Sequence, residues 1–588
     1  MADFTEITTT DMNAPWDGKG LPPGVRGMMK AMLGAAIVLG VPYVVALILP
    51  AQTVFLCPPG DEPTEAAPCV DVQKAAERLC AWLPGDPLFD EMFLTSASGG
   101  AAEGGLKKHG LAPGGGSILG EVDMGAAGGD APLPEGPVVL VTPETGHRPA
   151  TREGSSHSGA PDVQGAQGGD ATAAGDTGVP AEEHPYARIA IPAASWEGLT
   201  TFIEDERGVM GTFYRQLAKV VLKEPGAKVR IAQWGDSAIA ADGMTSAARR
   251  LLQRAFGDGG HGYAMVSASK PWYLRKDIVW TTAGWNTEEY IGDMAPDRRY
   301  GFGGMASVGY PGARASWKTL GVDGGEKVKE GTPGRTASHF EVHYLKQKGG
   351  GKFAVRIDGE EVALVDTAST SGLEDAYYLV DVPDAPHTLE VRATGGKAKV
   401  YGVVVERAGG VVYDGMGVVG ARDSRWLNVD EGHHIRALQQ RSPDLSILMY
   451  GGNQLEDKVT MDWYRGHLRT VLARWKKALP SKSCMLMSAI DHGEHYRGRI
   501  RTVPRQLEIM EVQRELAREV GCAWFSLYEA MGGNGAIGRW FDEGLASGDF
   551  AHPTAKGSVR LGQIFTQALM KGFHDWLEAE RVKDAGAP

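Results

Sequence analysis

The stretch from Ala31 to Leu56 contains no charged residue, and it most constrains how this chain of 588 residues can fold. An apolar run of this length exceeds the ~18–20 residues that cross the hydrocarbon core of a bilayer as a helix. The nearest charged residues before it are basic, namely Lys19, Arg26 and Lys30. Only acidic residues follow it before Lys74. Because positive charge marks the cytoplasmic side, we expect a single-pass transmembrane signal anchor at 31–56, after a cytoplasmic N-terminus at 1–30.

Everything after the anchor is therefore expected on the periplasmic, or extracytoplasmic, side of the inner (cytoplasmic) membrane. Disulfides persist in such compartments. A juxtamembrane segment at 57–94 holds Cys57, Cys69 and Cys80, whose pairing the sequence leaves open. A cleavable signal peptide is the alternative for the apolar stretch, but the run is long and no A-x-A cleavage pattern follows it.

Residues 95–184 contain 21 glycines and no Phe, Trp or Tyr. Without aromatic side chains this segment cannot bury enough apolar surface to offset the entropy lost on ordering. We expect a Gly/Ala-rich disordered linker, and a flexible coil of this length has a root-mean-square span of roughly 50 Å. Aromatic residues return at Tyr186, where a folded part is expected to begin.

The charge and cysteine patterns exclude two classes of partner. Acidic residues outnumber basic ones by 73 to 60, and the net charge of −13 has the wrong sign for binding a nucleic-acid backbone. Five cysteines without a C-x-x-C pair exclude a cysteine-rich zinc site. Neither nucleic acid nor a thiolate-bound metal is expected.

Two predicted strands deliver reactive side chains at their ends. A buried strand at 228–233 leads into a G-D-S motif at Ser237, which stands just before an amphipathic helix that ends at Gly257. Backbone N–H groups near a helix N-terminus are free to face a developing oxyanion. A second strand, at 445–450, delivers Asn453, whose side-chain amide can donate to the same oxyanion.

Near the C-terminus, Asp549 and His552 stand three residues apart before another predicted helix. This spacing lets one turn point both side chains the same way, so that the carboxylate orients the imidazole while the other ring nitrogen faces a serine. We therefore predict a catalytic triad in which Ser237 is the nucleophile, His552 the general base and Asp549 the orienting carboxylate.

These motifs occur in the order G-D-S, a glycine block at 415–422, G-x-N and D-x-x-H, which resembles the SGNH, or GDSL-type, hydrolase family. Residues 243–263, which end in FGDGGHGY, are similar to the bacterial peptidoglycan O-acetylesterases of that family. The resemblance implies an α/β fold of three α/β/α layers. It also implies an oxyanion hole made by Ser237, Gly420 and Asn453, with Gly417 as the alternative glycine.

The sequence departs from the family pattern at two positions. The family often has His after the serine of the first block, where this chain has Ala238, and often Glu after the Asn of the third, where it has Gln454. These changes leave the triad intact.

About 180 residues separate the first two blocks, more than a minimal SGNH fold requires. Six segments there read as short alternating strands: 338–345, 352–357, 361–366, 376–382, 387–394 and 397–407. Six short strands indicate a β-sandwich, and the esterases resembled here carry a carbohydrate-binding-like module at the same place. We expect such an inserted module at 301–408, between the two parts of a hydrolase fold at 185–300 and 409–588.

Two further groups of polar residues receive ordinary roles. Residues 491–495 (DHGEH) alternate carboxylates and imidazoles as metal ligands do, but they follow a predicted strand, so a substrate-contacting or solvated loop is expected. His433 and His434 begin a predicted helix, and we expect them to cap it or to lie on the surface.

Together these features predict a membrane-tethered serine esterase that removes O-acetyl groups from cell-wall polysaccharide. Its expected partners are acetylated polysaccharide or peptidoglycan and, through one N-terminal helix, the membrane; no metal or organic cofactor is expected. An O-acyltransferase on cell-wall or exported polysaccharide is the first alternative, because the same triad can pass its acyl group to a sugar hydroxyl. A non-catalytic cell-wall binding protein is the second, and the retained triad disfavours it.

Overall fold

A computed structural model describes residues 184–588 apart from 293, 325–327 and 586–588, together with three two-residue strands closer to the N-terminus. These strands are β1 (Phe55–Leu56), β2 (Val70–Asp71) and β3 (Val139–Leu140). Otherwise the predicted N-terminus, signal anchor, juxtamembrane segment and linker lie outside the described residues. Within the described part of the chain, no helix has the length and apolar character needed to span a membrane.

Two residues of the predicted linker form a strand. Strand β3 pairs antiparallel with β4 (Ile189–Ala190), which precedes the short 3-10 helix η1 (Ala193–Trp196). Val139 pairs with Ala190 and Leu140 with Ile189, and β-branched residues such as Val favour extended backbone. Val139 and Leu140 lie in the predicted linker, and the disorder of that linker stays a prediction.

A five-stranded parallel sheet forms the centre of the larger folded part, in the order β15-β5-β16-β17-β20. Its strands are β5 (Lys228–Gly235), β15 (Gly410–Gly417), β16 (Leu445–Met449), β17 (Ser483–Met487) and β20 (Ala523–Phe525). All neighbours in it run in the same direction. Their carboxyl ends therefore meet at one edge of the sheet.

Helices cover both faces of this sheet. One face packs against α5 (Gly211–Val221), α7 (Gly243–Phe256), α12 (Leu527–Ala530), α13 (Ala536–Asp542) and α14 (Ala555–Ala585). The other packs against α9 (Glu431–Arg441), α10 (Met461–Ala478) and α11 (Pro504–Val520). Strand side chains alternate between the two cores, so that Ile447 joins the first and Leu448 the second. The predicted α/β fold is confirmed.

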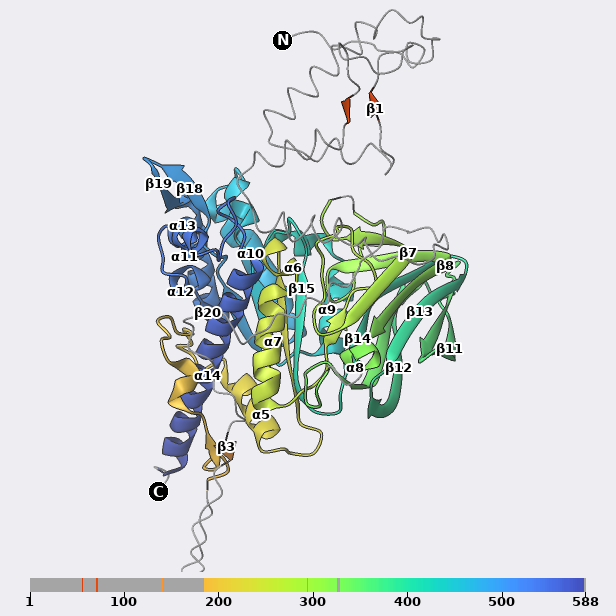
Figure 1. Cartoon of the computed structure of the whole chain (residues 1–588), viewed down its shortest axis with the longest axis horizontal. Helices are drawn as coiled ribbons and strands as arrows, with labels where there is room; N and C mark the ends of the chain where they lie inside the picture. The colour runs from red at the N-terminus through yellow and green to blue at the C-terminus, as the bar shows by residue number, and fades with distance from the viewer. Residues whose placement is uncertain are drawn as a thin grey trace, which may run out of the picture. The chain divides into compact units, whose positions relative to one another are not determined.

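Nine further strands form a separate antiparallel sheet, seen in green beside α7 in Figure 1. They are β6 (Gly262–Ala264), β7 (Val279–Glu289), β8 (Met305–Lys318), β9 (Ala337–Lys346), β10 (Lys352–Ile357), β11 (Glu360–Asp366), β12 (Glu374–Ala385), β13 (Thr388–Gly395) and β14 (Ala398–Glu406). A short helix, α8 (Leu320–Gly324), follows β8. Strands β9 to β14 coincide with the six predicted ones, whereas β6 and β7 lie in the segment expected to belong to the first part of the hydrolase.

The long strand β8 gives this sheet two arms. Its first half pairs with β14, which leads to β9 and β12, and its second half pairs with β13, which leads to β10 and β11. Apolar residues from both arms, including Trp317, Val342, Val355 and Val403, form one buried cluster. The two arms thus share a single core.

A buried group of charges joins the nine-stranded sheet to the parallel one. Glu406 at the end of β14 accepts hydrogen bonds from Lys228 and Arg230 of β5, at 2.7 and 2.9 Å, and pairs with Arg441 of α9. Arg441 also contacts Asp414 of β15 at 2.7 Å. Burial alone would raise the pKa of Glu406, but Arg441 and Arg230 hold it well below its usual value. Removing Glu406 would leave Lys228 and Arg230 without this buried carboxylate and Arg441 with Asp414 alone; breaking a buried ion pair by removing one partner costs about 3–5 kcal/mol.

The expectation for His433 and His434 is wrong, because both side chains are buried. His433 accepts a hydrogen bond from the N–H of Gly301 at 2.8 Å and contacts Asp375 of β12 at 2.6 Å. His434 stacks on Trp426. The side chain that caps α9 is that of Asp430, so the helix start exposes neither imidazole.

Candidate active site

The chain turns sharply between β5 and the nucleophile. A Cβ atom on Gly235 would lie 2.8 Å from the carbonyl oxygen of Met449 in β16, so only glycine fits at the strand end. Ser237 is the first residue of α6 (Ser237–Ala240), and Asp236 caps this short helix by accepting a hydrogen bond from the N–H of Ala238. The Ser237 side chain is thereby presented at the carboxyl edge of the sheet.

A chain of hydrogen bonds joins the three residues of the predicted triad. Ser237 Oγ lies 2.9 Å from His552 Nε2, and His552 Nδ1 lies 2.7 Å from Asp549 Oδ2. Because a carboxylate accepts at Nδ1, that nitrogen carries the proton and Nε2 is left to accept from the serine hydroxyl. The structure thus brings together the residues that the sequence assigned, in the order nucleophile, imidazole and carboxylate.

The D-x-x-H turn explains how one loop supplies both the carboxylate and the imidazole of the triad. Asp549 Oδ1 accepts hydrogen bonds from the backbone N–H groups of Ala551 and His552, at 2.9 and 3.1 Å, which closes the turn. The second oxygen remains for the imidazole. Phe550, between them, has a φ of 53°, in the left-handed region that a bulky residue seldom adopts. The turn therefore holds a strained backbone whose geometry points Asp549 and His552 the same way.

The triad carboxylate and imidazole shift each other's pKa values. Burial alone would raise the pKa of Asp549, but the hydrogen bonds from His552 and the backbone lower it to about 2. The hydrogen bond to Asp549 is the main cause that raises the pKa of His552. Asp549 therefore stays ionised at any physiological pH, and it stabilises the imidazolium that forms when His552 accepts a proton.

Asn453 lies at the site but its amide is already engaged. It begins the 3-10 helix η4 (Asn453–Glu456) after β16, and its Nδ2 donates to Asp236 Oδ2 and to the carbonyl of Ala421, both at 3.2 Å. Both contacts are long, so a forming oxyanion, which binds a donor more strongly than a neutral acceptor, competes with them. The oxyanion role of Asn453 stays a prediction.

Gly417 and Gly420, the two candidate glycines for the oxyanion hole, have different structural roles. A Cβ on Gly417 would lie 2.5 Å from the backbone nitrogen of Ala240, so Gly417 allows α6 to pack against the end of β15. Gly420, in the following loop, has a left-handed φ of 81°. Within the described residues, no protein acceptor contacts the N–H of Gly420 or of Ser237. Gly420 therefore remains the candidate oxyanion donor, although it does not line the cavity described below.

Sequence reasoning missed the role of Asp236 within the G-D-S motif. This carboxylate is 6% exposed, and burial raises its pKa although the N–H of Ala238 and the nearby imidazoles of His492 and His552 oppose the shift. Asp236 links α6 to Asn453, so it fixes the first block against the third. The only signal in the sequence was its place before the nucleophile.

The 491–495 segment does not have one common role. Asp491 is buried and accepts hydrogen bonds from Thr502 Oγ1 and the N–H of Ile537, at 2.7 and 2.9 Å. His492 Nδ1 donates to the carbonyl of Ile490 at 2.9 Å, and its other ring nitrogen would lie 2.7 Å from a Cβ on Gly452. This close approach explains the second glycine of the G-G-N motif.

A cavity of about 120 Å³ opens beside the triad. Its walls come from the loops after β5, β16 and β17 and from the D-x-x-H turn. The lining residues are Asp236, Ser237, Ala238, Met449, Gly452, Asn453, Glu456, Ala489, Ile490, His492, Ala551 and His552. Such a space holds a small acyl group next to Ser237, and a long fatty chain would not fit inside it.

The nine-stranded sheet contacts the loop that carries Gly420. The hydroxyl of Tyr273 accepts a hydrogen bond from the N–H of Val419 at 2.8 Å and donates to Glu289 of β7 at 3.2 Å. The side chain of Ile291, just after β7, lies 4.0 Å from the Cβ position of Gly420. Tyr273 is thus a positioning residue that ties the candidate oxyanion loop to the inserted sheet.

Known proteins resemble parts of this chain. Residues 386–560 match the model of the GDSL-like lipase/acylhydrolase family, a range that includes Asn453, Asp549 and His552. No curated protein sequence gives a significant match. The fold is similar to a solved structure described as a peptidoglycan O-acetylesterase in action, with 21% identity, a TM-score of 0.53, and coverage of 63% of this chain and 99% of that one. A family two carbohydrate esterase from Cellvibrio japonicus aligns at 12% identity over 51% of this chain and 99% of its own, with a TM-score of 0.21.

The predicted resemblance to SGNH, or GDSL-type, hydrolases, and among them to peptidoglycan O-acetylesterases, is therefore confirmed. At this level of identity the structural match shows the shared fold, and the chemistry is argued from the site itself.

The linkage between Asp549 and His552 predicts the pH dependence of aryl acetate hydrolysis. Only neutral His552 accepts the serine proton, so kcat/KM falls as the pH drops through its raised pKa. Asp549→Ala removes the main cause of that shift, so the acid limb of the profile moves to lower pH. In Asp549→Ala we expect the plateau of kcat/KM to fall ~10⁴-fold. Ser237→Ala or His552→Ala should each lower kcat ~10⁶-fold. Asp542→Ala, which removes an exposed carboxylate at the end of α13, is the control. An acid limb that stays in place in Asp549→Ala contradicts the assignment.

Asn453 and Gln454 are neighbouring amides in η4, and replacing each in turn distinguishes an effect on rate from an effect on stability. Asn453→Ala is expected to lower kcat by ~10²–10³ with little change in KM or Tm, because an oxyanion donor acts mainly in the transition state. Gln454→Ala should instead lower Tm, since the buried Gln454 amide donates to Asp423 at 3.0 Å. Both variants are measured by steady-state kinetics and thermal unfolding on the same preparations. A folded Asn453→Ala variant whose kcat stays within threefold of wild type would remove Asn453 from the oxyanion hole.

Proposed function

We propose that this chain is a serine esterase that removes O-acetyl groups from cell-wall polysaccharide, with peptidoglycan as the first candidate substrate. The observation that carries the proposal is the hydrogen-bonded chain from Ser237 through His552 to Asp549, placed beside a cavity of about 120 Å³. That volume suits an acetyl group and disfavours a lipase. The similarity in fold to a peptidoglycan O-acetylesterase supports the choice of substrate.

Acylation follows from the geometry of the triad. Ser237 Oγ attacks the ester carbonyl carbon while His552 Nε2 takes the hydroxyl proton, and Asp549 holds the imidazolium. The tetrahedral oxyanion is stabilised by the N–H groups of Ser237 and Gly420 and by the amide of Asn453. The bond to the sugar oxygen then breaks, and the proton on His552 passes to the leaving alkoxide. Acetyl remains on Ser237.

Deacylation repeats these steps with water. His552 removes a proton from a water molecule that attacks the acetyl carbonyl, and the same donors stabilise the second oxyanion. Collapse returns the proton to Ser237 Oγ and releases acetate. Each step uses groups of this chain and a water molecule, so no cofactor enters the scheme.

We assign the nine-stranded sheet as the inserted β-sandwich, a carbohydrate-binding-like module. The support is that its two arms enclose one apolar core, as the layers of a sandwich do. Its contact with Tyr273 and Gly420 would place bound polymer next to the reacting ester.

Acetate release tests the esterase proposal. The full chain is incubated with O-acetylated peptidoglycan, acetylated xylan and a small aryl acetate, and free acetate is measured with and without added sugar acceptors. We expect release without acceptor, fastest per acetyl group from peptidoglycan, and none from the Ser237→Ala variant. Turnover that requires an acceptor would identify an acyltransferase instead. Peptidoglycan pull-down without any turnover would identify a binding protein.

The proposed location is the outer face of the inner membrane, with residues 31–56 as the anchor. The charge asymmetry around this stretch supports it. A second support is the disulfide between Cys484 and Cys522, both buried, because disulfides are rare in the cytoplasm. Sequence reasoning pointed only to Cys57, Cys69 and Cys80, which the structure does not describe.

Topology is tested with a reporter fused after Pro588. We expect a reporter that folds only outside the cytoplasm to be active, and we expect the C-terminal part to be digested by protease added to spheroplasts. Resistance to protease that disappears on permeabilisation would overturn the proposed orientation.

A further inference from the structure

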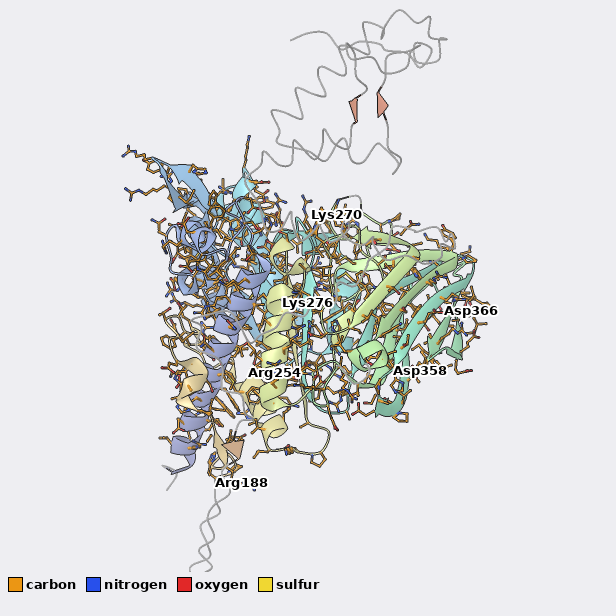
Figure 2. All side chains as sticks on the ribbon, viewed as in Figure 1. Arg188, Arg254, Lys270, Lys276, Asp358 and Asp366 are labelled. Atoms are coloured by element: carbon orange, nitrogen blue, oxygen red, sulfur yellow. A yellow bond between two sulfur atoms is a disulfide. The ribbon has the colours of Figure 1, made fainter. Side chains whose placement is uncertain are left out.

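A two-stranded hairpin projects from the carboxyl edge of the parallel sheet, at the upper left of Figure 1. It consists of β18 (Gly493–Tyr496) and β19 (Arg499–Thr502). In a chain with a net charge of −13, the hairpin is locally basic, because three arginines face a single carboxylate, that of Glu494. Figure 2 shows its side chains extending into solvent.

The hairpin organises its arginines around one aromatic ring. The guanidinium of Arg501 lies 3.7 Å from the ring centroid of Tyr496, which is 39% exposed, and that of Arg497 lies 5.2 Å from it. Such cation–π contacts restrict the arginine side chains, so less entropy is lost when a ligand binds.

Two of these positive charges are uncompensated. Arg501 pairs with Glu494, whereas neither Arg497 nor Arg499 has a carboxylate partner within the described residues. A guanidinium that is exposed and unpaired offers a planar pair of donors that matches a carboxylate.

The base of the hairpin is attached to the catalytic turn. The N–H of Gly493 donates to the carbonyl of Phe550 at 2.8 Å, and the ring of His495 meets that of Phe550 edge to face at 5.3 Å. Phe550 stands between Asp549 and His552, and His492, directly before β18, lines the cavity. At ~3.3 Å per residue, Tyr496 lies roughly 13 Å along the strand from that wall. The charges therefore stand within reach of units next to the reacting sugar.

We propose that the β18–β19 hairpin is a substrate-binding arm, in which Arg497 and Arg499 bind carboxylates on an acetylated polysaccharide whose ester lies at Ser237. The inference rests on the proposed esterase function and names the charge class of its substrate. Peptide carboxylates of peptidoglycan and the uronic acids of a polyuronate share this chemistry. The attachment to Phe550 favours a polymer substrate over an anionic lipid surface as the ligand.

Binding is measured first, because it does not depend on turnover. Full-length Ser237→Ala protein is titrated with peptidoglycan, with an acetylated polyuronate and with neutral acetylated xylan, with and without the added pair Arg497→Gln and Arg499→Gln. The matched control is Arg254→Gln, since Arg254 is exposed in the last turn of α7, away from the hairpin in Figure 2. Vesicles with anionic headgroups form a separate arm.

The double variant should weaken binding to a carboxylate-bearing polymer roughly five- to tenfold, as expected for two exposed charge contacts. Xylan binding should change by less than twofold, and the control should match the parent on every polymer. Binding by the parent should weaken between 0.01 M and 0.15 M salt, where the Debye length falls from about 30 to about 8 Å. Which anionic polymer loses more affinity identifies the carboxylate source. Equal effects on xylan and on both anionic polymers, no effect on any of them, or a loss confined to vesicles would overturn the proposal.

Turnover measurements distinguish failure of the hairpin proposal from failure of the esterase proposal. With Ser237 intact, the ratio of kcat/KM on the carboxylate-bearing polymer to that on acetylated xylan should fall roughly five- to tenfold in the double variant. If no substrate, including the aryl acetate, releases acetate with the wild-type chain, the esterase proposal fails while the binding result still stands. If acetate is released and the ratio does not change, the hairpin proposal alone fails.

Discussion

The parallel pairing of β15, β5 and β16 is the constraint on which the active site depends. Gly417, Gly235 and Met449 stand in register at the carboxyl ends of these strands. Because the three strands end at one level, the loops that follow them converge, and Ser237 meets residues that lie more than 200 positions away in the chain. Gly417 allows α6 to approach β15, and Gly235 allows the end of β5 to approach Met449 of β16, since a Cβ at either place would lie within 2.8 Å of backbone. A side chain at either position would push the nucleophile away from His552.

The inserted sheet is fixed to the parallel sheet by buried charge, near the amino end of β5, as well as by apolar contact. Separating the two sheets would break the contacts of Glu406 with Lys228, Arg230 and Arg441, which lie across the junction. The same docking brings Glu289 to Tyr273, and Tyr273 to the N–H of Val419. An insertion that interrupts the catalytic fold in sequence thus supports one of its loops in space.

Local patterns predicted what local physics determines. The D-x-x-H turn and the six alternating strands were visible in the sequence because a carboxylate can close its own turn and because period-two alternation reports a half-buried strand. The roles of His433 and Tyr273 were not visible, since each depends on a partner that the tertiary fold supplies: Asp375 for the imidazole, the N–H of Val419 for the hydroxyl. The pairing of Cys484 with Cys522 is of the same kind. The membrane anchor remains a prediction of the sequence.

The size of the cavity indicates that the acyl group and the rest of the substrate would be recognised by different parts of the protein. In the proposed esterase, a space of about 120 Å³ has room for the acyl group alone, and the side chain of His552 is 45% exposed, so the rest of the substrate would lie outside the cavity. Two surfaces border the triad there. On one side, Ile291, just after β7, approaches the candidate oxyanion residue Gly420, and on the imidazole side the hairpin of β18 and β19 contacts Phe550. A polymer whose ester reaches Ser237 would then run from the inserted sheet to the hairpin. Its specificity would depend on the groups that flank the ester, because many polymers carry the same acetyl group.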